Sequence, residues 1–405
     1  MIRSAGKEGE LNYAFNASIY DSDGIDEPYS RMMSDTSGLH DAYGFSSHET
    51  TTGGKYTNNE KYFSLSANYR GFYSTVSYTE IKKGMTFSLP VPGDDGMVKK
   101  HSSSTVLFGY NKKLSDKITF DGRFTYSQSN AFYNWALFEE SPHIGYENDF
   151  KFYETELDIF FCPIPDFDIT LGLYYRSIFE MEQDIDEPFL SGFANFKWGL
   201  DKDDEINTRA IFTQVNYKPS EHLKFVAGLR LEQMMKHTIF FIEHYGYEDY
   251  YEGSNDNIDD VAIIPRFAVI YNLNDRQIVK MLYGKSINRS FTDNVNTRAI
   301  FTQINYDLLD NLKIVAGLRG EQVEKYSLAW SQGPAENMEY TEIKGVYDKD
   351  DIEVIPRFAA ICTLNENNIF KLLHGKAINA PSLFQNSQQI QSGNENLEPE
   401  YIETF

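Results

Sequence analysis

Residues 117–127 read KITFDGRFTYS, and apolar and polar side chains alternate along the whole stretch. In a strand, a period of two places every second residue on the same face, so Ile118, Phe120, Phe124 and Tyr126 share one face. The same alternation returns in residues 153–161 and 169–175. Segments of about ten residues suit a tilted strand that crosses the hydrocarbon layer of a membrane. The pattern therefore predicts membrane-spanning β-strands.

The connections between these segments are alternately short and long. The short polar turns lie near 70–71, 112–116, 163–166, 219–222, 272–276, 307–311 and 365–368. The long polar stretches cover roughly 21–60, 82–103, 128–150, 177–205, 236–260, 325–351 and 380–398, with one short exception at 288–295. Outer-membrane barrels have short periplasmic turns and long extracellular loops. We therefore expect an all-β, transmembrane antiparallel β-barrel with about 16 strands in this chain, from Leu11 to a last strand that begins near Pro399.

Composition narrows the function further. A net charge of −23 disfavours a nucleic-acid partner, because binding phosphates requires cationic groups. The longest apolar runs are too short for a membrane-spanning helix. The 28 Tyr and 30 Phe suit the aromatic girdles of a membrane barrel as well as an ordinary β core. Cys162 and Cys362 have no metal-ligand spacing, and a single disulfide between them stays open. The first residues lack the apolar core of a signal peptide, so we expect the natural N-terminus to lie upstream.

The chain contains an internal repeat, with units at 207–288 and 296–379. NTRAIFTQVNY at 207–217 returns as NTRAIFTQINY at 296–306, and IIPRFAVI at 263–270 returns as VIPRFAAI at 354–361. Each unit contains two predicted hairpins, so an in-frame copy keeps every side chain on its original face. A tandem duplication and a gene-assembly artefact both explain the repeat. We treat residues 1–405 as one partial outer-membrane β-barrel.

The second unit and the residues after it resemble the barrel of TonB-dependent receptors. VAGLRGEQ at 315–322 is followed in family order by IPRFAAI, by HGKAINAPSLF at 374–384 and by GNENLEPEYIETF at 393–405. Glu395 stands where the family often has proline, and the first unit departs from the motif at 289–291. The motif positions expected to have structural roles are Pro381, Ser382, Gly393, Asn394, Leu397, Pro399 and Glu400. Among them, Pro381, Gly393, Asn394 and Pro399 are expected to set backbone turns.

The resemblance implies a function and partners. Members of this family usually pair an N-terminal plug with a 22-stranded barrel in the bacterial outer membrane. They take up a scarce nutrient, here expected to be a ferric siderophore or a cobalamin-like chelate. The TonB energy-transducing complex would act through a plug that we expect to be missing from this chain. Outer-membrane lipid is the other expected partner.

The candidate ligand-binding residues lie in an extracellular loop at 243–260, which holds seven acidic residues and no Lys or Arg. Tyr245, Tyr247, Tyr250 and Tyr251 supply aromatic area for stacking. The competing interpretation is a solvated acidic loop without a ligand. His237 and His244 have no recognised metal-ligand spacing, so we expect no metal and no cofactor.

No enzymatic activity is expected. Ser382 is not surrounded by a nucleophile-elbow pattern, so a catalytic triad is not indicated. Two other classes stay open. One is a non-coupled outer-membrane barrel, such as a porin-like channel, an adhesin or a phage receptor, and the other is a soluble β-rich secreted binder.

Overall fold

The computed structural model describes residues 1–24, 57–84, 98–135, 144–186, 195–200, 204–235, 238–244, 248–254, 261–289, 294–323, 326–332, 341–347, 352–365, 368–379 and 400–404. Within these ranges the regular elements are β-strands, 22 in number. The described part of the chain contains no helix that is long and apolar enough to cross a membrane. The prediction of an all-β chain is therefore confirmed.

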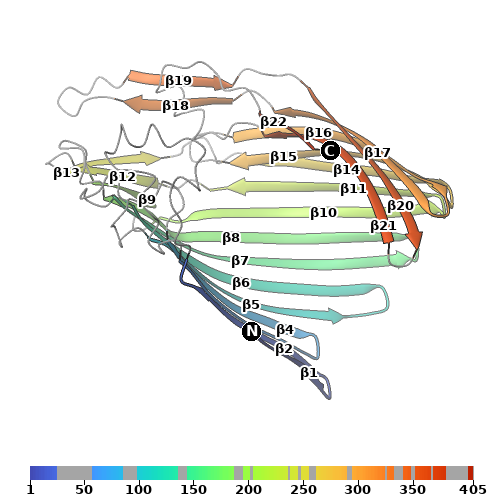
Figure 1. The fold of residues 1–405 in the computed structure, drawn as a ribbon, viewed down its shortest axis with the longest axis horizontal. Helices are drawn as coiled ribbons and strands as arrows, with labels where there is room; N and C mark the ends of the chain where they lie inside the picture. Colours follow the sequence, from blue (N-terminus) through green and yellow to red (C-terminus); the bar gives the residue numbers. More distant parts are fainter. Residues whose placement is uncertain are drawn as a thin grey trace.

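Twenty strands form one antiparallel sheet, and seventeen of these follow one another as a wall of long hairpins (Figure 1). The first wall strands are β1 (Ile2–Glu8), β2 (Leu11–Ser22), β3 (Asn58–Tyr69), β4 (Phe72–Gly84), β5 (Val98–Lys113), β6 (Ile118–Trp135), β7 (Ile144–Ile164) and β8 (Phe167–Asp186). The remaining wall strands are β10 (Ile206–Ser220), β11 (Leu223–Met234), β14 (Ala262–Asn274), β15 (Gln277–Arg289), β16 (Asn294–Leu309), β17 (Leu312–Val323), β20 (Glu353–Asn365), β21 (Asn368–Asn379) and β22 (Glu400–Thr404).

Five further strands lie in the long connections. They are β9 (Asn195–Leu200), β12 (Thr238–His244), β13 (Glu248–Ser254), β18 (Tyr326–Gln332) and β19 (Thr341–Tyr347). Strand β9 pairs with both β8 and β12, and β12 pairs with β13, so the connection after β8 and the connection after β11 share one ladder. Strands β18 and β19 form a separate hairpin. Figure 1 shows all five at the same end of the sheet.

The register gives the wall one apolar and one polar face. Residues that stand directly opposite each other in an antiparallel pair point to the same side, and Leu157 is opposite Leu173, which is opposite Ile211. The predicted outward residues Ile118, Phe120, Leu157 and Leu171 all share this apolar face. Leu171 and Ile211 are 51% and 55% exposed. The prediction that these four residues share a face is confirmed.

The polar face is the concave one. The most buried side chains of the wall nearly all lie on it, among them Ser64, Thr125, Asp158, Ala210, Ile264 and Ile355. Side chains converge and cover one another on the concave side of a curved sheet, whereas they spread apart on the convex side. The apolar face is therefore convex, as expected for a barrel that faces lipid outside and water inside.

The short turns lie on one rim, opposite the long connections (Figure 1). Arg70 and Gly71 both have positive φ, 52° and 90°, which is the backbone of the type I′ hairpin turn. Neighbouring turns are joined by ion pairs, Arg70 with Glu10 and Arg276 with Asp310. We call this edge the tight rim. The predicted asymmetry between short turns and long loops is confirmed.

The strands differ from the expectation in two details. Strand β1 was not predicted, because IRSAGKE lacks an apolar face, and the wall consequently has one strand more than the expected 16. The stretches 128–150 and 177–205 were expected to be loops, but β6 continues to Trp135, β7 begins at Ile144 and β8 continues to Asp186. The hairpin β12–β13 likewise occupies the predicted loop at 236–260. The long hairpins thus extend beyond the ten residues needed to cross lipid.

The two repeated units have the same strand pairing. Thr208 is opposite Met234 in the first unit, and Thr297 is opposite Val323 in the second, 89 residues later. Arg266 opposite Gly284 likewise corresponds to Arg357 opposite Gly375. Each unit contributes four wall strands, so both keep the convex and concave faces in phase. Both cysteines are free, which answers the open question of a disulfide.

Candidate functional site

The concave face carries a chain of charged and polar contacts along its middle strands. On β6 and β7, Arg123 Nη2 lies 2.7 Å from Glu156 Oε2. Tyr174 on β8 donates a hydrogen bond to Glu154 Oε2 on β7 at 3.1 Å, and the guanidinium of Arg230 on β11 lies 4.8 Å from the centre of the Tyr174 ring. These pairs satisfy charged groups on the inside of the wall, which makes the concave face compatible with a water-filled interior.

The concave face of β2 to β6 is polar but mostly uncharged. One row across these five strands consists of Asn16, Ser64, Ser77, Thr105 and Ser127, each directly opposite the next. Asn16 donates to Ser64 Oγ at 3.3 Å, and the hydroxyls of Thr105 and Ser127 are 3.1 Å apart. Small hydroxyl side chains here leave more room inside the wall than the arginines and tyrosines of the following strands.

Two aromatic rings on this face lie across glycines of the neighbouring strand. A Cβ built on Gly172 would lie 2.0 Å from Cζ of Phe212, and one built on Gly109 would lie 2.0 Å from Cζ of Tyr73. Tyr73 reaches beyond Gly109 and donates to Asp121 Oδ1 at 3.0 Å. Glycine lets each ring lie flat against the sheet, and the contact fixes the register of the strands.

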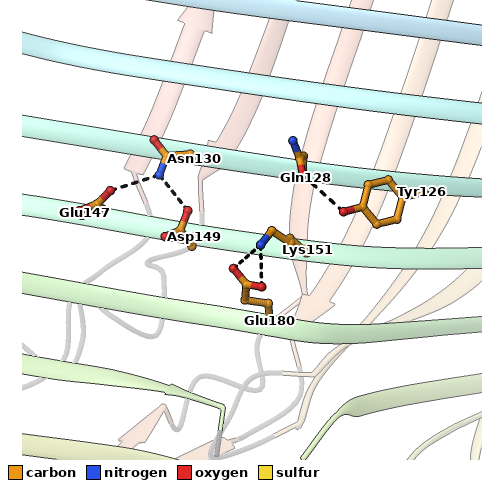
Figure 2. A network of polar contacts seen from close by, with 7 residues as sticks. All are labelled: Tyr126, Gln128, Asn130, Glu147, Asp149, Lys151 and Glu180. Carbon is orange, nitrogen blue, oxygen red and sulfur yellow. Dashed lines mark hydrogen bonds and ion pairs between the residues drawn. The ribbon is translucent and has the colours of Figure 1, made fainter. Parts of the chain in front are cut away.

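On the convex face, an aromatic cluster marks the level at which the strands leave the apolar zone. The ring centroid of Phe179 lies 6.2 Å from that of Tyr126 and 6.0 Å from that of Tyr153. Above them along the strands the same face becomes polar (Figure 2). Aromatic residues at such a boundary form the girdles of membrane barrels. This arrangement agrees with the girdle predicted from composition.

Figure 2 shows the polar network above this girdle. Asn130 Nδ2 donates to Asp149 Oδ1 at 2.8 Å and to Glu147 Oε1 at 3.3 Å. Lys151 Nζ donates to both carboxylate oxygens of Glu180, at 2.6 and 2.7 Å. This hydrogen bond to Glu180 raises the pKa of Lys151 above its ordinary value. The outer parts of β6, β7 and β8 therefore expose charge on the side that is apolar nearer the tight rim.

The concave face changes in the opposite direction at the same level. Tyr133 and Tyr146 are directly opposite each other, with ring centroids 5.4 Å apart in an edge-to-face arrangement. Phe150 and Phe152 follow on the same face of β7, with centroids 5.6 Å apart. Sequence reasoning did not single out these four residues, because Tyr133, Tyr146 and Phe150 lie in the stretch 128–150 that was assigned to a loop, and Phe152 comes just before the strand predicted from residue 153. The available signal was the alternation of 144–152, whose polar and apolar positions exchange faces relative to 153–161.

The predicted ligand tyrosines fall only partly within the described residues. Tyr250 and Tyr251 belong to β13, where their backbones are opposite Ile242 and Phe241 of β12. Tyr245 and Tyr247 lie outside the described residues. The ladder from β8 through β9 and β12 attaches β13 to the wall, above the level of the girdle. The ligand-binding role of these tyrosines stays a prediction.

The predicted motif positions lie mostly outside the described ranges. These are Pro381, Ser382, Gly393, Asn394, Leu397 and Pro399. Glu400 is described as the first residue of β22, opposite Asn379 of β21. Among the residues that the structure places, no group of three or more His, Cys, Asp and Glu side chains is arranged to hold a metal ion.

Solved structures that resemble this fold include an uptake receptor and two transporters. The chain matches the ferric yersiniabactin uptake receptor FyuA from Yersinia pestis with a TM-score of 0.61 and 9% identity, covering 95% of this chain and 66% of that one. The ferric citrate transporter FecA matches with a TM-score of 0.57 and 12% identity, covering 92% of this chain and 55% of FecA. The copper transporter OprC matches with a TM-score of 0.58 and 10% identity, covering 93% of this chain and 57% of OprC. At these identities the likeness shows the fold alone. The chain spans between 55% and 66% of the length of these three proteins.

A comparison with curated proteins finds no match. The family model described as TonB dependent receptor-like, beta-barrel matches residues 36–296 and again residues 286–405. The two matches meet where the first repeated unit ends and the second begins. Together they cover most of the chain and agree with the strand order, the asymmetric rims and the two faces of the wall. The chain therefore belongs to the family of TonB-dependent receptor β-barrels.

Proposed function

We propose that the protein containing this chain is a receptor of the bacterial outer membrane that takes up a scarce nutrient. The family match over residues 36–296 and 286–405 is the observation that carries the proposal. Ferric siderophore is the first candidate ligand class and a cobalamin-like chelate is the second. The named relatives in fold include receptors for ferric yersiniabactin and ferric citrate and a copper transporter, which supports a metal chelate as the cargo.

The faces of the wall agree with this role. The convex face, with residues such as Leu171 and Ile211, suits contact with outer-membrane lipid, because each exposed apolar side chain gains by leaving water. The concave face carries ion pairs such as Arg123 with Glu156, which tolerate a polar cargo or a polar plug. We also propose that import depends on a plug and on the TonB energy-transducing complex.

The test uses the complete gene product in a Gram-negative host that lacks its own siderophore receptors. Uptake of radiolabelled ferric chelates and of cobalamin is measured under iron limitation, with and without a functional TonB. We expect uptake of one chelate that disappears when TonB is removed. Uptake that is equal in both strains, together with an open conductance in planar bilayers, would instead establish a non-coupled channel. Extraction of the protein without detergent would favour a soluble binder.

A further inference from the structure

Four aromatic side chains line the concave face where the strands extend beyond the girdle. We call Tyr133, Tyr146, Phe150 and Phe152 the aromatic strip. All four are partly exposed, and they follow one another from the outer ends of β6 and β7 down toward the interior. In Figure 1 this part of the hairpins lies toward the end that holds β9, β12 and β13. A cargo that enters from the outside would meet the strip before it meets the charged interior.

A cation lies over each end of the strip. The Lys99 ammonium lies 4.8 Å from the centre of the Tyr133 ring, and the Arg176 guanidinium lies 4.3 Å from the centre of the Phe152 ring. Each cation stands on a neighbouring strand, β5 or β8, on the same concave face. The arrangement combines flat aromatic area with positive charge, although the chain as a whole carries a net charge of −23.

Arg176 is the informative member of this group. Its Nε is buried and has no hydrogen-bond partner among the described residues. Glu154 stands directly opposite Arg176, yet its carboxylate accepts a hydrogen bond from Tyr174 instead. Another arginine on this face, Arg230, is paired with an acid, Glu232, at 2.7 Å. A buried hydrogen-bond donor without an acceptor destabilises the folded protein unless another group, such as a bound ligand, accepts its hydrogen bond.

The geometry points to an anionic chelate that carries aromatic rings as the cargo first bound on the aromatic strip. Its rings would stack against Phe150 and Phe152, and its anionic oxygens would accept hydrogen bonds from Arg176. A ferric catecholate has both features. Ferric citrate is anionic but has no ring, and cobalamin has no net negative charge. This inference rests on the proposed function and narrows its ligand class.

The experiment measures binding to the purified complete protein in detergent, with three probes: the ferric complex of dihydroxybenzoate, ferric citrate and cyanocobalamin. The variants are Phe152→Leu and Arg176→Gln, with Arg176→Lys to retain charge. Matched controls lie on the opposite face of the same strands or the adjacent one: Tyr153→Leu for the ring and Arg209→Gln for the guanidinium. Heat-modified mobility on gels confirms that each variant is folded.

We expect the dihydroxybenzoate complex to bind more tightly than the other two probes. Phe152→Leu and Arg176→Gln should each weaken its binding by about tenfold, whereas the two controls should leave it unchanged. Arg176→Lys should bind better than Arg176→Gln. If Phe152→Leu does not fold, the inference is tested by comparing the binding of the dihydroxybenzoate complex to Arg176→Gln and to Arg176→Lys.

The failures of the inference and of the proposed function are distinguishable. Native protein that binds ferric citrate or cyanocobalamin but not the dihydroxybenzoate complex overturns the inference and leaves TonB-dependent uptake standing. Unchanged binding of the dihydroxybenzoate complex in folded Phe152→Leu and Arg176→Gln also overturns it. Absence of energy-dependent uptake for every chelate in cells overturns the proposed function instead.

Discussion

The ring of Phe212 on β10 lies across Gly172 on β8, so close that a Cβ at Gly172 would meet its Cζ at 2.0 Å. Gly172→Ala should therefore destabilise the barrel by about 1–3 kcal/mol, because the ring must leave its place on the sheet. Urea unfolding of the protein in lipid vesicles measures the loss. Gly284→Ala is the matched control, since nothing lies within 4 Å of a Cβ there. Equal stability of the two variants would contradict this account of the register.

Leu171 on β8 tests the assignment of the convex face. It is 51% exposed and lies a few residues from the tight rim, so in a membrane it faces hydrocarbon. Leu171→Arg should cost about 2–4 kcal/mol on folding into vesicles. Thr170→Arg, the next residue along β8 and on the concave face, should cost much less because its charge faces water. A larger loss at residue 170 than at 171 would reverse the two faces.

The repeat predicts that one unit is dispensable for folding. Deleting residues 207–295 joins Ile206 to Asn296, and the strand that follows then reads NTRAIFTQINY in place of NTRAIFTQVNY. Strand β16 would pair with β8 in the register that β10 has now, because the two sequences differ only by Ile for Val. We expect the shortened protein to fold, shown by heat-modified mobility and protease resistance. Aggregation of the deletion protein would show that the units are not interchangeable.

The Lys151–Glu180 pair predicts a stability change at alkaline pH. The pKa of Lys151 is raised in the folded protein, mainly by its hydrogen bond to Glu180. The pair therefore stabilises the folded protein fully below the ordinary lysine pKa of 10.5. This stabilisation is lost as the pH rises through the higher pKa that Lys151 has in the folded protein. Melting temperatures followed from neutral to strongly alkaline pH should fall less steeply in Lys151→Met and in Glu180→Gln. Curves parallel to that of the native protein would leave the pair without a role.

The four tyrosines predicted to bind the ligand supply the last prediction. Replacing Tyr245, Tyr247, Tyr250 and Tyr251 together by Ser should lower the affinity for the chelate, since aromatic stacking area is lost. Binding of the chelate that supports growth measures the effect. The Asp and Glu residues of 248–260, changed to Asn and Gln, provide the comparison. Affinity unchanged by the tyrosine replacements would favour a solvated acidic segment without a ligand.

The sequence alone determined most of the wall strands, the faces of their apolar segments and the difference between the two rims. Alternation from Ile118 to Tyr126 fixes which side chains share a face, because a strand has a period of two whatever its surroundings. The dipeptide at 70–71 likewise fixes a tight turn through local backbone geometry. Strand β1 escaped prediction because it has no apolar face and is held by its ladder with β2.

Only the tertiary structure decided what lies above the membrane. Phe152 and Tyr153 are neighbours in sequence, but one belongs to the concave strip and the other to the convex girdle, and alternation cannot tell at what height the solvent on each face changes. The ladder between β9 and β12 joins Lys197 to Ile242, which belong to two different connections of the wall, and their pairing depends on where β8 and β11 place those connections. Local periodicity gives the face of a residue, whereas depth and long-range partners depend on how the strands assemble.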